Sequence, residues 1–271
     1  MIQANESTTT AERTARVNER AMCAAALLVF ACAAGATLYF SQSMSGGMPM
    51  PGNWTMEMMW MPMGGAFRAA GMFTIMWAAM MIAMMLPSTM PILLLYRRAA
   101  TFRGEKHVGQ ATFAVGSGYF LIWTLFGIVV YLIGMAVARG AMRSAALSRA
   151  LPLTGGFALC VAGIYQLTPW KSACLKHCRD PLGFVAAHLR GGRFGALRLG
   201  FHHGAFCVAC CWALMLIQLV LGVMSLAIMA AVAVVIALEK LIPRGEWIAK
   251  ATGVATIAAG MMVAGLSLRV M

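Results

Sequence analysis

The segment ATFAVGSGYFLIWTLFGIVVYLIGMAV, residues 111–137, decides the fold class, because its 27 consecutive residues include no charged side chain. An α-helix rises about 1.5 Å per residue, so this segment is long enough to cross the roughly 30 Å hydrocarbon core of a bilayer. Six further apolar runs recur along the chain, at residues 21–40, 71–96, 152–170, 204–221, 224–241 and 247–268. We therefore expect an all-α, polytopic transmembrane helix bundle of about seven spans.

The composition supports this class. The 271 residues are 61% hydrophobic and only 11% charged, whereas about a quarter of the residues of an ordinary soluble domain are charged. No stretch alternates with a period of two for long enough to predict a membrane β-barrel. We expect a polar N-terminal tail at residues 1–20 and a single transmembrane domain at residues 21–271. The fifth and sixth runs are nearly continuous and are broken only around residues 222–225, which predicts a tight helical hairpin.

The first apolar run has two interpretations. Its Arg-bearing start and small residues also fit a secretory signal, whose cleavage would leave six spans. Its apolar stretch is longer than the 7–15 residues of a signal core, which favours an uncleaved helix.

The formal net charge is +13, and most Lys and Arg residues fall in alternate loops, which would lie on one side of the membrane. Sixteen of the 21 Lys and Arg residues fall before the first run, or after the second, fourth and sixth runs. The other five are Arg68, Arg139, Arg143, Arg149 and Arg269. Short loops rich in Lys and Arg stay cytoplasmic, so we expect a bacterial inner-membrane protein with a cytoplasmic N-terminus and a periplasmic C-terminus. The charge then reflects topology and attraction to the lipid bilayer, and we expect no nucleic-acid partner.

Methionines crowd the expected outer loop at residues 41–70. The stretch MSGGMPMPGNWTMEMMWMPMGG holds eight methionines between Met44 and Met63, with no Cys or His. Thioethers are soft ligands that favour Cu(I), and they cannot form disulfides in an oxidising compartment. The alternative is an apolar segment that lies on the bilayer surface, with Trp54 and Trp60 at the interface. The candidate metal ligands of this loop are Met56, Met58, Met59, Met61 and Met63.

Cysteines and histidines mark the opposite side. In HHGAFCVACCW, residues 202–212, helical geometry places His203, Cys207, Cys210 and Cys211 on one stripe. Gly200 and Gly204 form a GxxxG spacing, which permits close approach of a neighbouring helix.

A second group of soft ligands lies upstream, in the basic inner loop at residues 171–203. The stretch SACLKHC, residues 172–178, carries Cys174, His177 and Cys178. The loop is long enough to bring both groups together at the inner membrane surface. Thiols stay reduced inside the cell, so the combined groups predict a Cu(I) site. Two alternatives stay open: buried cysteines also act as small hydrophobes, and zinc would use the same ligand types.

Two further features border this predicted site. Met84 and Met85 precede Pro87, a residue that tends to kink a helix, and the kink would shape a pocket beside them. Glu239 ends the sixth run. It would pair with Lys240 or Arg244 at the helix end, or face the cysteine stripe as a ligand or proton acceptor.

These motifs carry a family resemblance. MMIAMMLPSTMPILLLY, YQLTPWKSACLKHCRDPLGF, HHGAFCVACCWALM and GVMSLAIMAAVAVVIALEKLIP resemble the motifs of a bacterial family of metal-binding integral membrane proteins, a domain of unknown function. The resemblance covers roughly residues 70–245 and implies a polytopic inner-membrane protein with a metal site. The residues that it implies for that site are Cys174, His177, Cys178, His203, Cys207, Cys210 and Cys211, with Met84, Met85 and Glu239 in support.

Three functions fit these observations. The first is Cu(I) handling, either transport or delivery to a metallochaperone or copper-acceptor protein. The second is a membrane thiol–disulfide redox enzyme that uses Cys174, Cys178, Cys207 and Cys210. The third is a structural subunit of an oligomer or membrane complex. The chain has no GxxxxGK[ST] phosphate loop and no constellation of catalytic Ser, His and Asp, so a non-enzymatic role is favoured.

Overall fold

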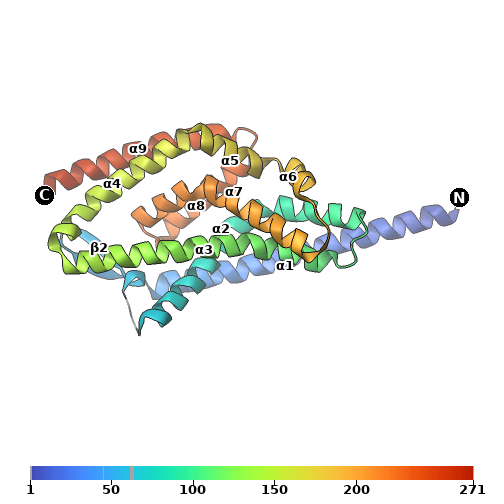
Figure 1. Ribbon diagram of the computed structural model, residues 1–271, viewed down its shortest axis with the longest axis horizontal. Helices are drawn as coiled ribbons and strands as arrows, with labels where there is room; N and C mark the ends of the chain where they lie inside the picture. Colours follow the sequence, from blue (N-terminus) through green and yellow to red (C-terminus); the bar gives the residue numbers. More distant parts are fainter. Residues whose placement is uncertain (1, 45, 62–63, 271) are drawn as a thin grey trace.

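The computed structural model describes residues 2–44, 46–61 and 64–270. Helices account for most of these residues, which confirms the all-α bundle (Figure 1). The helices are α1 (Ile2–Ser43), α2 (Ala66–Phe102), α3 (Val108–Arg143), α4 (Ala145–Leu167), α5 (Pro169–Arg179), α6 (Pro181–His188), α7 (Gly192–Leu221), α8 (Leu226–Leu241) and α9 (Gly245–Val270). The helix α1 includes residues 2–20 of the polar tail.

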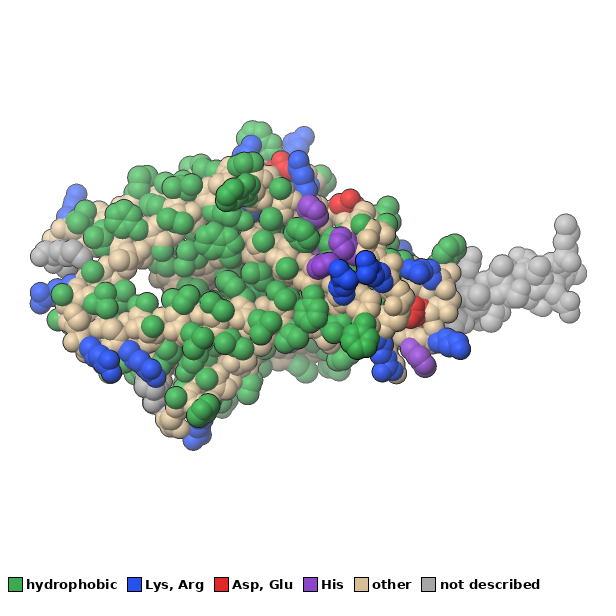
Figure 2. Space-filling view, in the orientation of Figure 1, with side chains coloured by type: hydrophobic (Ala, Val, Ile, Leu, Met, Phe, Trp, Pro, Cys, Tyr) green, Lys and Arg blue, Asp and Glu red, His purple; other side chains and the backbone are tan. Residues whose placement is uncertain are grey.

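Six helices of the described chain are long and apolar enough to cross a membrane. They are α2, α3, α4, α7, most of α9, and α1 from Glu19 onward. The sixth expected span, residues 224–241, forms as α8, but its 16 residues rise only about 24 Å, which is short of the bilayer core. Figure 2 shows hydrophobic side chains over the lateral surface of the bundle, with Lys and Arg gathered mainly towards its two ends.

Close helix pairs build the bundle. The helices α3 and α7 pack along each other, as do α4 and α9 (Figure 1). A Cβ atom added at Gly118 of α3 would lie 2.5 Å from the carbonyl oxygen of Leu197 in α7. One added at Gly200 would collide with the carbonyl of Val115. The close approach that the GxxxG spacing predicts is therefore confirmed, and its partner is α3.

The turn between α7 and α8 contacts the outer loop. The predicted hairpin between α7 and α8 forms, with Gly222 at a positive φ of 122° and the Ser225 hydroxyl accepting from the backbone N–H of Ile228. The outer loop contains two antiparallel strands that the sequence analysis missed, β1 (Gly47–Met50) and β2 (Trp54–Glu57). The Glu57 carboxylate accepts a 3.3 Å hydrogen bond from the backbone N–H of Met224, which docks the hairpin on the α7–α8 turn.

The helix α2 runs unbroken through both of its prolines, Pro87 and Pro91. The hydroxyls of Ser88 and Thr89 both donate to the carbonyl of Met85, at 3.0 and 2.9 Å. The carbonyls that lose a backbone donor to these prolines are those of Ala83 and Pro87, four residues before each proline. The kink that the sequence predicts at Pro87 stays a prediction.

Candidate metal centre

Three of the predicted thiols lie on α7. Cys207, Cys210 and Cys211 are fully buried, and they lie near the middle of the helix rather than at its inner end. The spacing i, i+3, i+4 places them on one face, as predicted. They lie in the main core cluster together with methionines of α2, so the site is inside the bundle.

The short helix α5 supplies the fourth thiol. Its start is fixed locally: the Thr168 hydroxyl accepts from the backbone N–H of Lys171, and Pro169 occupies the first turn, where no backbone donor is needed. The helix then carries Cys178 to α7, where its sulfur lies 3.8 Å from the sulfur of Cys210. The folding back of the basic loop thus brings Cys178 to the α7 thiols.

Cys174 does not join this group. It is half-buried against the core, and its sulfur makes no hydrogen bond to another thiol within the described chain. The structure therefore brings together four thiols, those of Cys178, Cys207, Cys210 and Cys211, which we call the thiol cluster. The sulfurs of Cys210 and Cys211 lie 3.2 Å apart.

The thiol cluster is compact but not arranged around a metal position. Among the described residues, no group of three or more His, Cys, Asp or Glu side chains could hold a metal ion as it stands. Metal–thiolate bonds of about 2.3 Å at tetrahedral angles separate two sulfurs by about 3.8 Å. The pair Cys178–Cys210 meets that spacing, whereas Cys210 and Cys211 would have to move apart by side-chain rotation.

Positive charge lies directly against the thiol cluster. The ammonium of Lys240 donates to the Cys207 sulfur at 2.9 Å, and the Tyr119 hydroxyl lies 3.0 Å from the same sulfur. Lys240 is 7% exposed and Tyr119 is fully buried. An ammonium group in a low-dielectric interior is stable only beside negative charge. The surroundings of Cys207 therefore favour its thiolate, the form that binds metal. At the edge of the cluster, hydrogen bonding to Cys207 raises the pKa of the Cys178 thiol.

A second buried cation corrects the prediction for Glu239. The Glu239 carboxylate pairs with Lys171 of α5 at 2.7 Å and accepts a 3.2 Å hydrogen bond from the Gln166 amide, rather than pairing with Lys240 or Arg244. This pairing could not be predicted because Lys171 and Lys240 lie at the ends of apolar runs, where a basic residue usually lies in a loop and indicates topology. Lys171 also donates to the Cys210 carbonyl at 2.6 Å, so the ion pair anchors α5 and α8 to the helix that carries the thiols.

The two predicted histidines lie in different surroundings. His203 is 3% exposed and stacks on Tyr119 with ring centroids 5.2 Å apart. Its Nδ1 has no hydrogen-bond partner among the described residues. It precedes Cys207 by one helical turn. His177 is exposed, and its ring stacks on Phe206 at 4.5 Å. The structure thus places His203, but not His177, in the buried interior.

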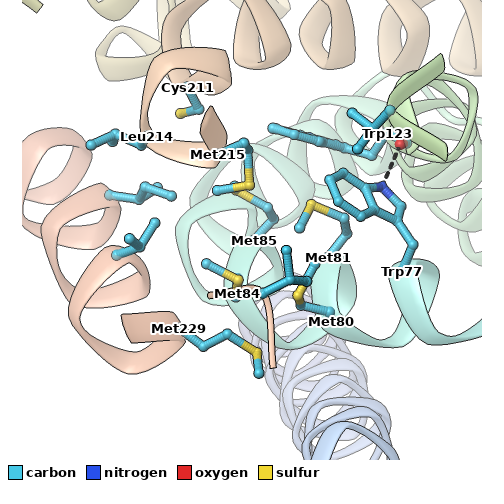
Figure 3. Packing of buried hydrophobic residues seen from close by; sticks show 14 of the residues in the cluster. Trp77, Met80, Met81, Met84, Met85, Trp123, Cys211, Leu214, Met215 and Met229 are labelled. Carbon is cyan, nitrogen blue, oxygen red and sulfur yellow. Dashed lines mark hydrogen bonds between the residues drawn. The ribbon is translucent and has the colours of Figure 1, made fainter. Parts of the chain in front are cut away.

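The predicted methionines divide by location. Met84 and Met85 are buried in the main core, where Figure 3 shows Met85 and Met215 below Cys211. In the outer loop, Met56 and Met59 are buried, while Met58 and Met61 are half-buried. Met63 lies outside the described residues. Met59 packs in the main core and Met56 packs with Ala138 and Ala141 of α3, and the role of the outer-loop methionines as ligands stays a prediction.

Several residues of this region carry no motif that sequence reasoning could use. Tyr119 lies on α3 and Gln166 on α4, and only the packing of these helices brings them to the thiol cluster and its ion pair. Met215 lies on α7 one turn after Cys211, where helical spacing alone would place it. Their one sequence signal is a polar or sulfur-bearing side chain within an apolar run.

The chain was compared with known proteins. A family model, PpoB2, described as a copper chaperone, matches residues 74–263, which is more than two thirds of the chain. This range includes the whole thiol cluster, Lys171, Glu239 and Lys240, but not the methionine-rich outer loop. No curated protein matches the chain. No solved structure matches it either.

Proposed function

The chain belongs to the copper chaperone family, and from that premise we propose that it holds Cu(I) inside a membrane and passes it to another protein. The ion would be bound by the thiol cluster and delivered to a copper-acceptor protein, or transported between the two faces of the membrane. The charge distribution supports a bacterial inner membrane as the location, with the N-terminus in the cytoplasm and the C-terminus in the periplasm.

One observation carries this proposal. Cys178 of α5 meets Cys207, Cys210 and Cys211 of α7 in a fully enclosed site beside the ammonium of Lys240. Thiolate sulfurs are the ligands that Cu(I) prefers, and a linear or trigonal Cu(I) complex needs only two or three of them. A cuprous ion bound by two thiolates carries a net charge of −1, which the Lys240 ammonium balances. Structural zinc would use four closed ligands, and four thiolates would leave a larger negative charge in the interior.

The chain has no ATP-binding loop, so the release of copper would need another driving force. A tighter acceptor supplies one by mass action, because an ion leaves a site when a stronger ligand set removes it from solution. A gradient of copper across the membrane is the other source.

The experiment compares two double variants in competition with a strong, coloured Cu(I) chelator under anaerobic, reducing conditions. Cys207→Ser with Cys210→Ser should lower the Cu(I) affinity at least 100-fold, because it removes the thiolates that the ammonium supports. Cys23→Ser with Cys32→Ser makes the same chemical change on α1, away from the thiol cluster, and should leave the affinity unchanged. Equal retention of copper by wild type and by the Cys207/Cys210 variant would assign these thiols to packing.

A membrane thiol–disulfide enzyme is the second candidate, because the sulfurs of Cys178 and Cys210 lie 3.8 Å apart and could form a disulfide after a small movement. Such an enzyme would lose two free thiols when a quinone is added, and would regain them on reduction. A quinone-dependent loss of two thiols in copper-free protein would favour this candidate over Cu(I) delivery.

A further inference from the structure

One polar side chain in the middle of the apolar core has an unusual partner. Gln218 of α7 is 2% exposed, and its amide nitrogen donates to the thioether sulfur of Met80 at 3.1 Å. Its amide oxygen has no hydrogen-bond partner within the described residues. A buried polar atom that lacks a partner destabilises the folded protein. A leucine at position 218 would fill the core without leaving a polar atom unpaired. The presence of glutamine therefore indicates that its amide oxygen acts as a ligand.

Two further buried methionines, Met84 and Met229, share the main core with Met80. Met80 and Met84 lie one helical turn apart on α2, and Met229 lies on α8, which packs beside it. All three are buried, at 2%, 6% and 6% exposure, and belong to the main core. In Figure 3 the side chains of Met80, Met84 and Met229 extend from α2 and α8 towards the same region, which lies on the side of Met85 away from Cys211. Methionine has three rotatable bonds, so its sulfur adjusts readily around an ion.

We propose that Met80, Met84, Met229 and the Gln218 amide oxygen form a second Cu(I) site, separate from the thiol cluster. The inference rests on the proposed function, since it takes Cu(I) as the cargo. Three thioethers and one amide oxygen are neutral donors, and the thioethers select a soft monovalent ion over hard cations such as Mg²⁺ or Ca²⁺.

The difference in donor charge orders the two sites. An ion held by neutral donors keeps its full positive charge in the low-dielectric interior, whereas thiolates neutralise it. The thioether site is therefore the weaker of the two, and a Cu(I) ion bound there moves towards the thiols. A weak site next to a strong one is suited to transit rather than to storage. This arrangement makes the four residues a step on the route of copper through the bundle.

Silver(I) tests the proposal directly, because it is a soft monovalent ion that does not change oxidation state under these conditions. The wild-type protein with methyl-¹³C-methionine is titrated with Ag(I) and followed by NMR and by calorimetry. Wild type should bind two ions with separate affinities, and the methyl signals of Met80, Met84 and Met229 should shift during the second, weaker event. A single binding event with no shift of these three signals would overturn the proposal.

A matched pair of triple variants separates coordination from packing. Met80→Leu, Met84→Leu and Met229→Leu keep the volume of the core and should abolish the second event, with at least a tenfold loss of affinity. Met142→Leu, Met261→Leu and Met262→Leu change three exposed methionines and should bind as wild type does. Equal second-site binding by the two triple variants would contradict the assignment. Unfolding temperatures identify a variant that is misfolded, and Gln218→Leu then provides an independent test, since it should weaken the second event without disturbing the first.

The thiol-free protein distinguishes a failure here from a failure of the proposed function. With Cys178, Cys207, Cys210 and Cys211 all changed to Ser, the first event should disappear and the second should remain. If wild type binds one ion and the thiol-free protein binds none, the thiol site stands and the thioether site is rejected. If only the thioether event is present in both proteins, the thiol-based function is rejected instead.

Discussion

Buried charge is the distinguishing feature of this protein at the scale of single residues. Lys171, Glu239 and Lys240 are each at most 7% exposed, although ionisable side chains in membrane proteins are costly and normally functional. Lys171 and Glu239 neutralise each other, and the same ammonium binds the Cys210 carbonyl. Lys240 has no carboxylate partner among the described residues and contacts Cys207 and Ser88. Its charge is therefore available to balance a thiolate or a thiolate-bound ion.

Changing Lys240 to Met should weaken Cu(I) binding about 10- to 100-fold, the range typical when a group that supports metal ligands is removed. Methionine keeps the length and the apolar stem of lysine but removes the charge beside Cys207. The Cu(I) affinity is measured by competition with a coloured chelator. Lys240→Arg keeps the charge and should retain most of the affinity. Lys250→Met changes an exposed lysine on α9 and serves as the control. Unchanged affinity in Lys240→Met would remove Lys240 from this account.

At the scale of elements, the position of α7 depends on glycines. The thiols of α7 and the hydroxyl of Tyr119 meet because α3 and α7 approach with little side-chain volume between them. Gly118 lies one residue before Tyr119, so any side chain there acts on the thiol cluster through α3.

Changing Gly118 to Leu should lower the free energy of unfolding by at least the ~1–3 kcal/mol typical of overpacking, because its side chain meets the α7 backbone at Leu197. The same substitution at Gly116, two residues earlier on α3, meets no atom within 4 Å and is the matched control. Thermal unfolding in detergent, followed by tryptophan fluorescence, compares the two. Similar unfolding temperatures for Gly118→Leu and Gly116→Leu would show that the helices are not in close contact at this point.

The outer hairpin should dock more firmly in mild acid, because burial raises the pKa of Glu57 above its ordinary value of 4.5. A raised pKa means that the folded protein binds the proton more tightly than the unfolded chain does. The stabilisation is therefore complete below about pH 4.5 and is lost as the pH rises through the raised pKa. Glu57→Gln is neutral at every pH and escapes this loss.

The unfolding temperature of Glu57→Gln relative to wild type should therefore increase between pH 5 and pH 8. Thr55→Ala, at an exposed position of the same strand as Glu57, removes no ionisable group and is the control, so its difference from wild type should be constant. A constant difference for Glu57→Gln as well would show that the Glu57 carboxyl does not titrate differently in the folded protein.

At the scale of the whole molecule, hydropathy was sufficient to predict the bundle, and helical spacing was sufficient to predict the stripe of Cys207, Cys210 and Cys211. The sequence could not show which residues of the basic loop fold back. Cys178 reaches the thiols, whereas Cys174, one turn earlier on the same face of α5, packs against the main core and makes no hydrogen bond to another thiol among the described residues. The buried positions of Lys171 and Lys240 were equally hidden, since charges near the end of an apolar run usually lie in water. The hairpin β1–β2 could not be predicted from the sequence, because Pro49 and Pro51 interrupt any strand pattern.

The most direct test of the central claim is X-ray absorption at the copper edge on wild-type protein loaded anaerobically with one equivalent of Cu(I). A first shell dominated by sulfur is predicted, and changing Cys178, Cys207, Cys210 and Cys211 all to Ser should leave no bound copper when the loading is done in competition with a chelator that outcompetes the weaker thioether site. A first shell of only oxygen and nitrogen in the wild-type protein would contradict this prediction.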